Sequence, residues 1–168
     1  MAFMEISPRE IPGNVIGRIA DEWMLVAAGS PAGHNMMTAS WGGMGELWGL
    51  DVAVTVLRPQ RYTRAFVEKA DRFSLTFFGG DKSMHGVCGS QSGRDVDKTA
   101  LTGLTPVFGH GTVYFAQARL ALICRKVYVQ RIDPACFIDK TLDEKWYPEK
   151  DYHYMYVGAI EKALIPEE

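Results

Sequence analysis

Short apolar runs alternate with polar, glycine-containing turns along most of the chain. Residues 50–57 (LDVAVTVL) and 72–78 (RFSLTFF) are rich in β-branched and aromatic residues, which favour extended strands. Residues 14–19 and 23–28 are apolar runs on either side of the polar pair Asp21-Glu22, a pattern that predicts a β-hairpin. The regular structure of the chain is therefore expected to be mainly β.

The second half of the chain continues this pattern. Residues 113–132 form a long β-prone run that we expect to divide into two strands near Gln117. Residues 154–165 form the last apolar run and should complete the sheet. The pattern predicts about seven or eight strands, and a closed antiparallel barrel suits them because closure removes exposed sheet edges. Strands do not alternate with helices of roughly 10 to 15 residues, which argues against a doubly wound parallel sheet.

About two or three short helices are predicted between the strands. Residues 60–70 (QRYTRAFVEKA) follow Pro59, which favours a corner, and Thr63 is a suitable N-cap for a helix there. Further short helices are expected after Asp81 and near Asp95.

Size and charge narrow the classes of protein to which the chain can belong. Its 168 residues suit a single domain spanning residues 1–168, since domains usually contain roughly 100 to 200 residues. The net charge of −2 gives no general attraction to nucleic acid, and no apolar run approaches the ~20 residues of a membrane-spanning helix. Cys88, Cys124 and Cys136 form no CxxC pair, and the N-terminus lacks the pattern of a signal peptide. We therefore expect a cytoplasmic protein without nucleic-acid or membrane partners.

The first candidate for function is the cluster of arginines in LRPQRYTR. Arg58, Arg61 and Arg64 lie beside the predicted helix start, where free backbone N–H groups and the helix dipole attract anions. Arginine adds forked donors that match phosphate oxygens, and Thr63 adds a hydroxyl. The alternative is a solvated basic surface on which Thr63 is a plain helix cap.

The second candidate is the loop CGSQSGRDVDK, residues 88–98. Ser90 and Ser92 flank a tight turn at Gly93, and successive backbone N–H groups in such a turn can bind an anion. Lys98 follows within reach of the same loop. The alternative is a surface loop that only caps a helix.

The third candidate is the stretch NMMTASWGGMGELWG, residues 35–49. Glycines and small side chains let a flat ligand approach the backbone, and Thr38 and Ser40 can hydrogen-bond a heteroaromatic edge. Trp41 and Trp48 could form the wall of such a pocket. The alternative is a barrel corner with core tryptophans.

Familiar catalytic patterns are missing from the sequence. No GxGxxG follows a strand, and neither a GxxxxGK[ST] phosphate loop nor a GxSxG elbow occurs. His85 and Cys88 are close in sequence, but two ligands do not make a zinc site. The sequence therefore predicts no metal site and no catalytic acid–base or nucleophile constellation.

Taken in order and spacing, NMMTASWGG, LRPQRYT, GSQSGRDVDKTALTGLT and the ending YHYMYVGAIEKALI resemble the flavin reductase-like FMN-binding split-barrel family. The likeness is greatest to the flavoredoxin branch. It implies a split antiparallel β-barrel with Greek-key connections and a few short helices, and a homodimer with FMN near its interface. It also implies transfer of hydride from NAD(P)H through FMN, with a non-enzymatic FMN-binding electron carrier as the alternative. A third possibility, an oxidase for a pyridoxamine-type phosphate, would need a second arginine cluster that the sequence lacks.

The resemblance also assigns roles to residues. The strand around residues 37–41 would lie beside the flavin ring, the arginine motif would bind or frame the phosphate and ribityl chain, and residues 90–98 would close over the phosphate side. The implied cofactor-binding residues are Met37, Thr38, Ala39, Ser40, Trp41, Arg58, Arg61, Thr63, Ser90, Ser92, Gly93 and Lys98. His153 and Tyr154 would lie on the substrate side, near the open face of the flavin. NAD(P)H or a redox partner protein would exchange electrons there.

Overall fold

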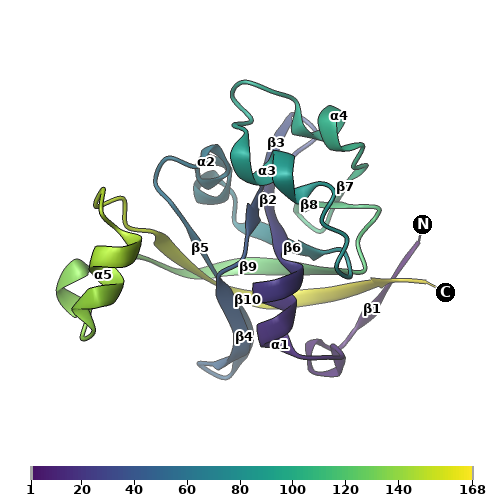
Figure 1. The fold of residues 1–168 in the computed structure, drawn as a ribbon. Helices are drawn as coiled ribbons and strands as arrows, with labels where there is room; N and C mark the ends of the chain where they lie inside the picture. Colours follow the sequence, from purple (N-terminus) through teal and green to yellow (C-terminus); the bar gives the residue numbers. More distant parts are fainter. Residues whose placement is uncertain (1, 168) are drawn as a thin grey trace.

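The computed structural model describes residues 2–167, and strands dominate this part of the chain (Figure 1). The strands are β1 (Phe3–Ile6), β2 (Met24–Ser30), β3 (Gly33–Ala39), β4 (Gly42–Leu47), β5 (Leu50–Leu57), β6 (Arg72–Phe77), β7 (Pro106–Gly109), β8 (Thr112–Phe115), β9 (Leu120–Arg131) and β10 (Tyr154–Pro166). The α-helices are α1 (Val15–Gly17), α2 (Tyr62–Lys69), α3 (His85–Ser90), α4 (Lys98–Thr102) and α5 (Lys140–Trp146). A π-helix (Arg18–Glu22) and two 3₁₀-helices (Pro8–Glu10 and Pro134–Cys136) accompany them.

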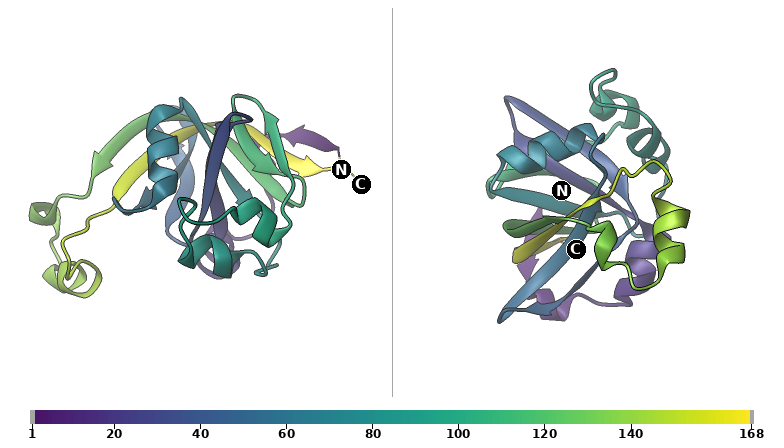
Figure 2. Two further views of the ribbon diagram at one scale, coloured as in Figure 1. Left: turned by 90° about the horizontal axis from the view of Figure 1, so that it is seen from above. Right: turned by 90° about the vertical axis from the view of Figure 1, so that its left-hand side faces the viewer.

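Eight strands form one antiparallel sheet in the order β3-β2-β6-β9-β10-β5-β4, with β1 paired to β10. Strands β3 and β4 stand at opposite ends of this order, although only Ser40 and Trp41 separate them in sequence. The sheet therefore curls until its ends approach one another, and the resulting barrel is split beside β3 (Figures 1 and 2). The expected split antiparallel barrel is confirmed.

The corner between β3 and β4 depends on a glycine. Gly42 has a φ of 153°, and a Cβ there would lie 2.1 Å from the carbonyl oxygen of Val54. A side chain cannot be added without moving the backbone, because glycine alone tolerates both this φ and this approach. Gly42 thus lets β4 pair with β5 immediately after the corner, where it lies opposite Thr55.

Apolar side chains from most strands of the sheet fill the barrel interior. Phe73, Phe77, Leu122 and Tyr156 are fully buried in this core. Truncating a buried leucine such as Leu122 to alanine costs roughly 2 to 5 kcal/mol, so the core holds the barrel firmly. This barrel carries the residues of the candidate site.

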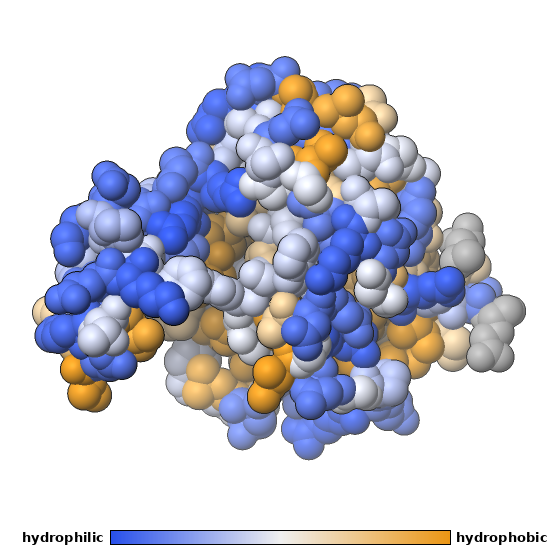
Figure 3. Space-filling view, viewed as in Figure 1, coloured by the Kyte–Doolittle hydropathy of each residue, from blue (hydrophilic) through white to orange (hydrophobic). Residues whose placement is uncertain are grey.

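Strands β9 and β10 pair along their length and end together at Arg131 and Tyr154. Residues 132–153, called the arm, leave the barrel between them and carry α5 (Figure 2, left). Apolar side chains gather near the end of the arm, at the lower left of Figure 3, and Ile138 and Leu142 are among the exposed apolar residues of this segment. The arm is therefore only partly covered by the barrel.

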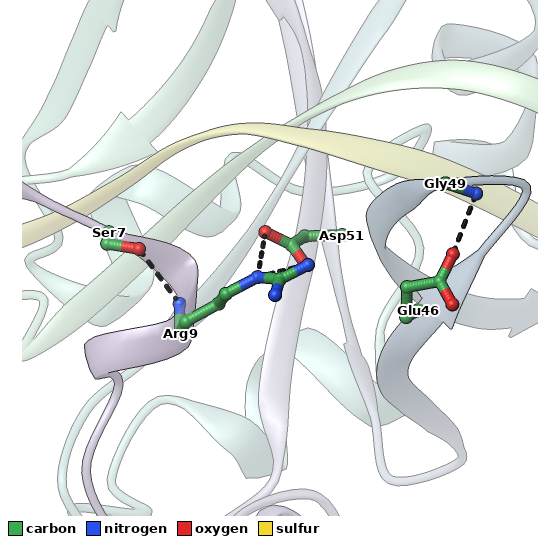
Figure 4. Close-up of polar contacts among 5 residues, drawn as sticks. All are labelled: Ser7, Arg9, Glu46, Gly49 and Asp51. Carbon is green, nitrogen blue, oxygen red and sulfur yellow. Dashed lines mark hydrogen bonds and ion pairs between the residues drawn. The ribbon is translucent and has the colours of Figure 1, made fainter.

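The N-terminal segment is fastened to the sheet by polar contacts. The Arg9 guanidinium donates from Nε to both carboxylate oxygens of Asp51, at 3.0 and 3.2 Å (Figure 4). In the turn between β4 and β5, the Glu46 carboxylate accepts the backbone N–H of Gly49 at 2.7 Å (Figure 4). These contacts hold the hairpin at the β4 end of the sheet.

Most strands lie where the hydrophobic pattern predicts them. β5 coincides with residues 50–57, β6 covers residues 72–77, and the long run 113–132 is divided around Gln117 into β8 and β9. Residues 154–165 lie in β10. The described residues contain ten strands, more than predicted, because the short strands β1, β4 and β7 were not recognised in the pattern.

The predicted hairpin at residues 14–28 is wrong in its first strand. The Asn14 side chain accepts the backbone N–H groups of Ile16 and Gly17, which starts a helical segment that continues to Glu22. The apolar residues of this segment therefore follow a helical path, and only β2, from Met24, is a strand.

The predicted cap of α2 is also wrong. Arg61 is the N-cap residue, and its side chain makes no capping hydrogen bond. Thr63 lies inside the first turn, where its side chain is buried and accepts a hydrogen bond from Asn35 Nδ2 at 2.9 Å. The Thr63 hydroxyl therefore bonds Asn35 on β3 instead of capping the helix.

Candidate functional site

A pocket of about 150 Å³ opens at the split in the barrel. The outer edge of β3 forms one wall, and the end of β5, the start of α2 and the base of the arm form the rest. The lining residues are Met37, Thr38, Ala39, Ser40, Trp41, Val56, Arg58, Arg61 and His153. All of these except Val56 were predicted as site residues. Val56 lies near the end of β5, two positions before Arg58 in the sequence, and this spacing could have indicated it.

The β3 wall of the pocket is a free strand edge. Within residues 2–167, β3 pairs with β2 alone, through contacts such as Met37 with Val26 and Thr38 with Leu25. Backbone N–H and C=O groups on the other edge of β3 have no strand partner and need one from a side chain, water or a ligand. A flat ligand with polar atoms on its rim could hydrogen-bond this edge.

Arg61 places a cation at the end of this pocket. Its Nη1 donates to the carbonyl oxygen of Gly89 on α3 at 2.5 Å, and it forms no salt bridge with any carboxylate of the described residues. Burial, together with the nearby charge of Arg58, lowers the pKa of the Arg61 guanidinium. A partly buried arginine beside a helix N-terminus, without a carboxylate, suits the binding of an anion.

Arg58 differs from Arg61 because it already has a partner. Its Nη1 lies 2.5 Å from Oδ2 of Asp151, and its Nη2 donates to the carbonyl oxygen of Trp146 at 3.0 Å. Its guanidinium also lies over the ring of Tyr147, 5.4 Å from the centroid. Arg58 therefore lines the pocket while fastening the arm to the barrel.

Lys98 is buried between β3 and α3. Its ammonium donates to the carbonyl oxygens of Met36 at 2.9 Å and Cys88 at 3.1 Å. Burial lowers the pKa of the Lys98 ammonium, and the charge of Arg61 adds to this effect. Lys98 therefore holds the strand against the helix, and the structure does not place it in the lining of the pocket.

Two predicted serines are engaged within their own loop. Ser90 Oγ donates to the carbonyl oxygen of Gly86 at 2.7 Å, and Ser92 Oγ accepts the backbone N–H of Arg94 at 3.2 Å. Neither serine lines the pocket. Their contact with a phosphate stays a prediction.

Gly93 lies against the side chain of Asn35 on β3. A Cβ at Gly93 would lie 2.1 Å from Oδ1 of Asn35, so the loop approaches the strand as closely as glycine alone allows. Gly93, Asn35 and Lys98 line a neighbouring polar hollow of about 400 Å³. The predicted loop residues are thus near the same strand as the pocket but beside a different part of it.

Thr38 connects the pocket wall to a histidine that the sequence did not single out as a site residue. Thr38 Oγ1 donates to the carbonyl oxygen of His85 at 2.9 Å and lies 3.1 Å from its Nδ1. The His85 side chain is buried, and burial lowers its pKa to about 4. The Thr38 hydroxyl therefore faces α3, which leaves the backbone edge of β3 as the part of this residue that can meet a ligand.

Aromatic rings form the wall on the arm side. His153 Nδ1 lies 2.9 Å from the Tyr147 hydroxyl, and the Trp41 ring packs beside His153 and Trp146 at centroid distances of 5.1 and 4.8 Å. Burial, followed by the charge of Arg58, lowers the pKa of His153 to about 4, so the ring is neutral at pH 7.

Tyr154 does not line this pocket. Its ring lies under the Arg64 guanidinium, 3.8 Å from the centroid, so it faces α2. The structure thus brings His153 to the pocket and keeps its neighbour Tyr154 away.

The pocket offers groups that suit the binding of a flat, negatively charged ligand. It combines a free strand edge, an arginine without a carboxylate partner and an aromatic wall that can border a flat ring. In the part of the chain that the structure describes, no group of histidine, cysteine and acidic residues is arranged to hold a metal ion. None of the described helices combines the length and the apolar character that crossing a membrane requires.

Comparisons with known proteins agree with this geometry. The model of the flavin reductase like domain matches residues 16–168. No curated protein matches the sequence. The match to the flavin reductase like domain confirms the family that the motifs predict.

Solved structures show the same fold. Flavoredoxin from Methanosarcina acetivorans is 21% identical, with 87% of this chain and 69% of that chain covered and a TM-score of 0.68. Flavoredoxin of Desulfovibrio vulgaris is 20% identical, with 88% and 70% covered and a TM-score of 0.67. An FMN-binding domain of a flavin reductase-like enzyme from Shewanella baltica is 16% identical, with 98% and 77% covered and a TM-score of 0.66.

Proposed function

The chain belongs to the flavin reductase-like domain family, and from this premise we propose that it is an FMN-dependent oxidoreductase that accepts hydride from NAD(P)H. The observation that carries the proposal is the pocket at the split, where the free edge of β3 meets the guanidinium of Arg61, which forms no salt bridge with a carboxylate of the described residues. The two features lie at one site and suit the two chemically different parts of FMN.

The pocket residues fit both ends of that cofactor. FMN joins a flat ring with a polar edge to a negatively charged phosphate. The backbone of β3 and the corner after it, residues 37–41, can hydrogen-bond the ring edge, and Arg61 can form a charge-assisted contact with the phosphate. When bound, FMN supplies the hydride chemistry, while the protein binds and orients it.

The chain's own groups limit what else happens at the pocket. His153 is neutral at pH 7 and is held by Tyr147, so it can form a hydrogen bond on the substrate side without adding charge. Trp41 and Val56 line one side of the pocket and would shield a bound ligand from water there. These features support orientation of a nicotinamide near His153, with no protein acid or base required for hydride transfer.

A second copy of the chain is the proposed partner in a homodimer. The pocket encloses about 150 Å³, whereas sites for molecules of cofactor size usually enclose roughly 300 to 1,000 Å³. A second copy placed over the split would enlarge and close the site.

The described cysteines are all free, which supports the proposed cytoplasmic setting, because disulfides are rare in reducing compartments.

An electron carrier is the second candidate function. Trp41 and Trp146 stay 37% and 40% exposed at the rim of the pocket, where a partner protein could approach the flavin. Such a protein would bind FMN firmly and exchange electrons with another protein rather than with a nicotinamide. The same pocket serves both functions, so kinetics must separate them.

The test is the absorbance of the FMN-loaded protein under anaerobic conditions, before and after addition of NADH or NADPH. The reductase proposal predicts rapid bleaching of the flavin bands by at least one nicotinamide. If neither nicotinamide bleaches the flavin but a reduced redox protein does, the chain is an electron carrier. If no FMN binds at all, both functions are rejected.

A further inference from the structure

A second hollow lies on the other side of the β3–β4 corner from the pocket. It encloses about 450 Å³ between the helical segment of residues 15–20 and the start of β4. Figure 1 shows α1 beside β4 on this side of the molecule. We call it the corner groove, and its lining residues are Val15, Ile16, Ile19, Ala20, Ser40, Trp41, Gly42, Gly43 and Met44.

The corner groove has no ionisable side chain in its lining. Aliphatic residues and a methionine form most of it, and Ser40 and the Trp41 indole supply the polar side-chain groups. A charged molecule would lose its hydration there without gaining an opposite charge, which is costly. A neutral ligand with apolar rings and one hydrogen-bonding group matches this lining, whereas a dinucleotide with its phosphates does not.

The helical wall of the groove is irregular and leaves apolar surface uncovered. Residues Arg18–Glu22 form a π-helix, and Trp23 directly after it has a φ of 68°, which is rare for a bulky residue. Ile16, on the groove side of this wall, is 78% exposed. Irregular helical turns and unusual φ values are frequent at functional sites, where the surrounding structure maintains them.

The strand wall contains a glycine that the fold does not require. A Cβ at Gly43 would meet no atom within 4 Å, and its φ lies outside the left-handed region. Neither backbone conformation nor packing therefore explains a glycine here, in contrast to Gly42 next to it. Gly43 lines the corner groove, and a side chain added at this position would meet open space.

The corner groove adjoins the pocket through shared residues. Ser40 and Trp41 line both hollows, and Trp41 also packs against Trp146 and His153 of the pocket wall. We propose that the corner groove binds a small, neutral aromatic molecule, with Trp41 between this ligand and the pocket. That the ligand is a co-substrate of the flavin rests on the proposed function; the binding site itself does not.

The binding test uses 2-naphthol as the neutral probe and 2-naphthoate as a charged probe of the same ring size. Backbone amide NMR spectra of the protein are recorded with and without FMN. The proposal predicts that 2-naphthol shifts amides of residues 15–20 and 42–44, and that 2-naphthoate binds at least about tenfold more weakly because its charge is desolvated. Shifts confined to Arg61 and His153, or no binding, would overturn the proposal.

A matched pair of variants makes the assignment specific. Gly43→Val fills the open space and should weaken 2-naphthol about tenfold or more, with FMN affinity retained. Gly45→Val is the control, because Gly45 lies on the same strand with equally open space but outside the groove. Equal effects of the two variants would contradict the assignment.

Light scattering tests whether a second copy of the chain, rather than a small molecule, occupies the corner groove. If Ile16→Asp turns a dimer into a monomer, a second copy covers the corner groove and the proposal fails. If the oligomeric state is unchanged and 2-naphthol binding is lost, the proposal is supported. A protein that binds 2-naphthol in the groove but no FMN would leave this site standing and reject only the proposed function.

Discussion

The two sides of the pocket are held in place by different kinds of contact. On the barrel side, buried polar groups join β3 to α3 and α4: Lys98 bridges Met36 and Cys88, and Thr38 bonds His85. On the arm side, the buried bond between Tyr147 and His153 lies within the arm itself. The arm is fastened to the barrel by the partly exposed pair Arg58 and Asp151, whose side chains are 27% and 20% exposed. The comparison indicates a preformed wall where the proposed cofactor ring would lie and a more adjustable wall on the proposed substrate side.

The energetic reason lies in the surroundings of each contact. A buried hydrogen bond that loses one partner leaves a desolvated group unsatisfied, whereas an exposed pair is replaced by water at little cost. The β3 wall should therefore resist opening until the whole barrel unfolds. The arm should open locally, since its outer residues, such as the exposed Ile138, have few barrel contacts to lose.

The largest expected effect is loss of the buried ammonium. Lys98→Met removes two charge-assisted hydrogen bonds to Met36 and Cys88, so we expect about 3 to 5 kcal/mol of destabilisation in urea unfolding. Lys162→Met is the control, because Lys162 pairs with Glu5 at the surface. Its substitution should lower the free energy of unfolding by less than about 1 kcal/mol. Similar losses for the two variants would remove the distinction between buried and exposed contacts.

The next effect is a loss of stability in acid. An unfolded histidine has a pKa near 6.5, whereas burial holds His85 near 4, so below 6.5 the unfolded chain binds more protons. Neutral His85 contributes as much as about 3 kcal/mol to the free energy of unfolding above pH 6.5. This contribution disappears as the pH falls toward 4. Unfolding measured from pH 7.5 to 4.5 should show this slope, and His85→Gln should flatten it.

His153 provides the corresponding measurement on the arm side. Its pKa is also lowered to about 4, but protonation there can be accommodated if the arm opens. As the pH falls from 6.5 to 4, hydrogen exchange of residues 132–153, corrected for intrinsic rates, should therefore become faster, while β3 stays protected. If β3 and the arm lose protection together, the two walls are a single unit.

A smaller effect separates the two arginines in flavin binding. Arg61→Gln should weaken FMN binding by about 1.5 to 3 kcal/mol, because Arg61 pairs with no carboxylate of residues 2–167 and its remaining N–H donors can contact a phosphate. Arg58→Gln should cost less than about 1 kcal/mol, since Arg58 already pairs with Asp151. Fluorescence titration with FMN measures both, and Arg125→Gln is the control because Arg125 pairs with Glu161 away from the pocket. A larger loss at Arg58 than at Arg61 would reverse the assignment.

The smallest effect concerns the fastening of the arm. Asp151→Asn removes the charge that holds Arg58, and we expect a stability change of about 1 kcal/mol or less. The nicotinamide KM should change more than the FMN affinity, because the arm forms the proposed substrate side. Steady-state kinetics measure the nicotinamide KM of this variant, and titration measures its FMN affinity. Equal changes in KM and in FMN affinity would contradict the prediction.

The sequence was informative where local patterns decide the structure. Residues 50–57 and 72–77 are strands, as expected from their β-branched and aromatic residues, which fit a pleated and largely buried surface. The pocket-forming motif at residues 37–41 was predicted together with Arg58 and Arg61, and all of these lie in one pocket.

Tertiary partners decide the features that the sequence did not reveal. The long aliphatic stem of Lys98 lets its ammonium reach the interior of the protein. Only the fold shows that two carbonyl oxygens accept hydrogen bonds from it there. The bond between Thr38 and His85 joins residues 47 positions apart, with no periodic signal. The arm was not recognised because α5 is short and packs little of its surface on the barrel.

The most direct test of the account is hydrogen exchange of the protein with and without FMN, followed by mass spectrometry. If the flavin lies along the free edge of β3, FMN should slow the exchange of residues 37–41 and of the start of α2 at Tyr62, and should protect the arm less. Protection at the arm or the corner groove without protection of residues 37–41 would contradict the proposed site.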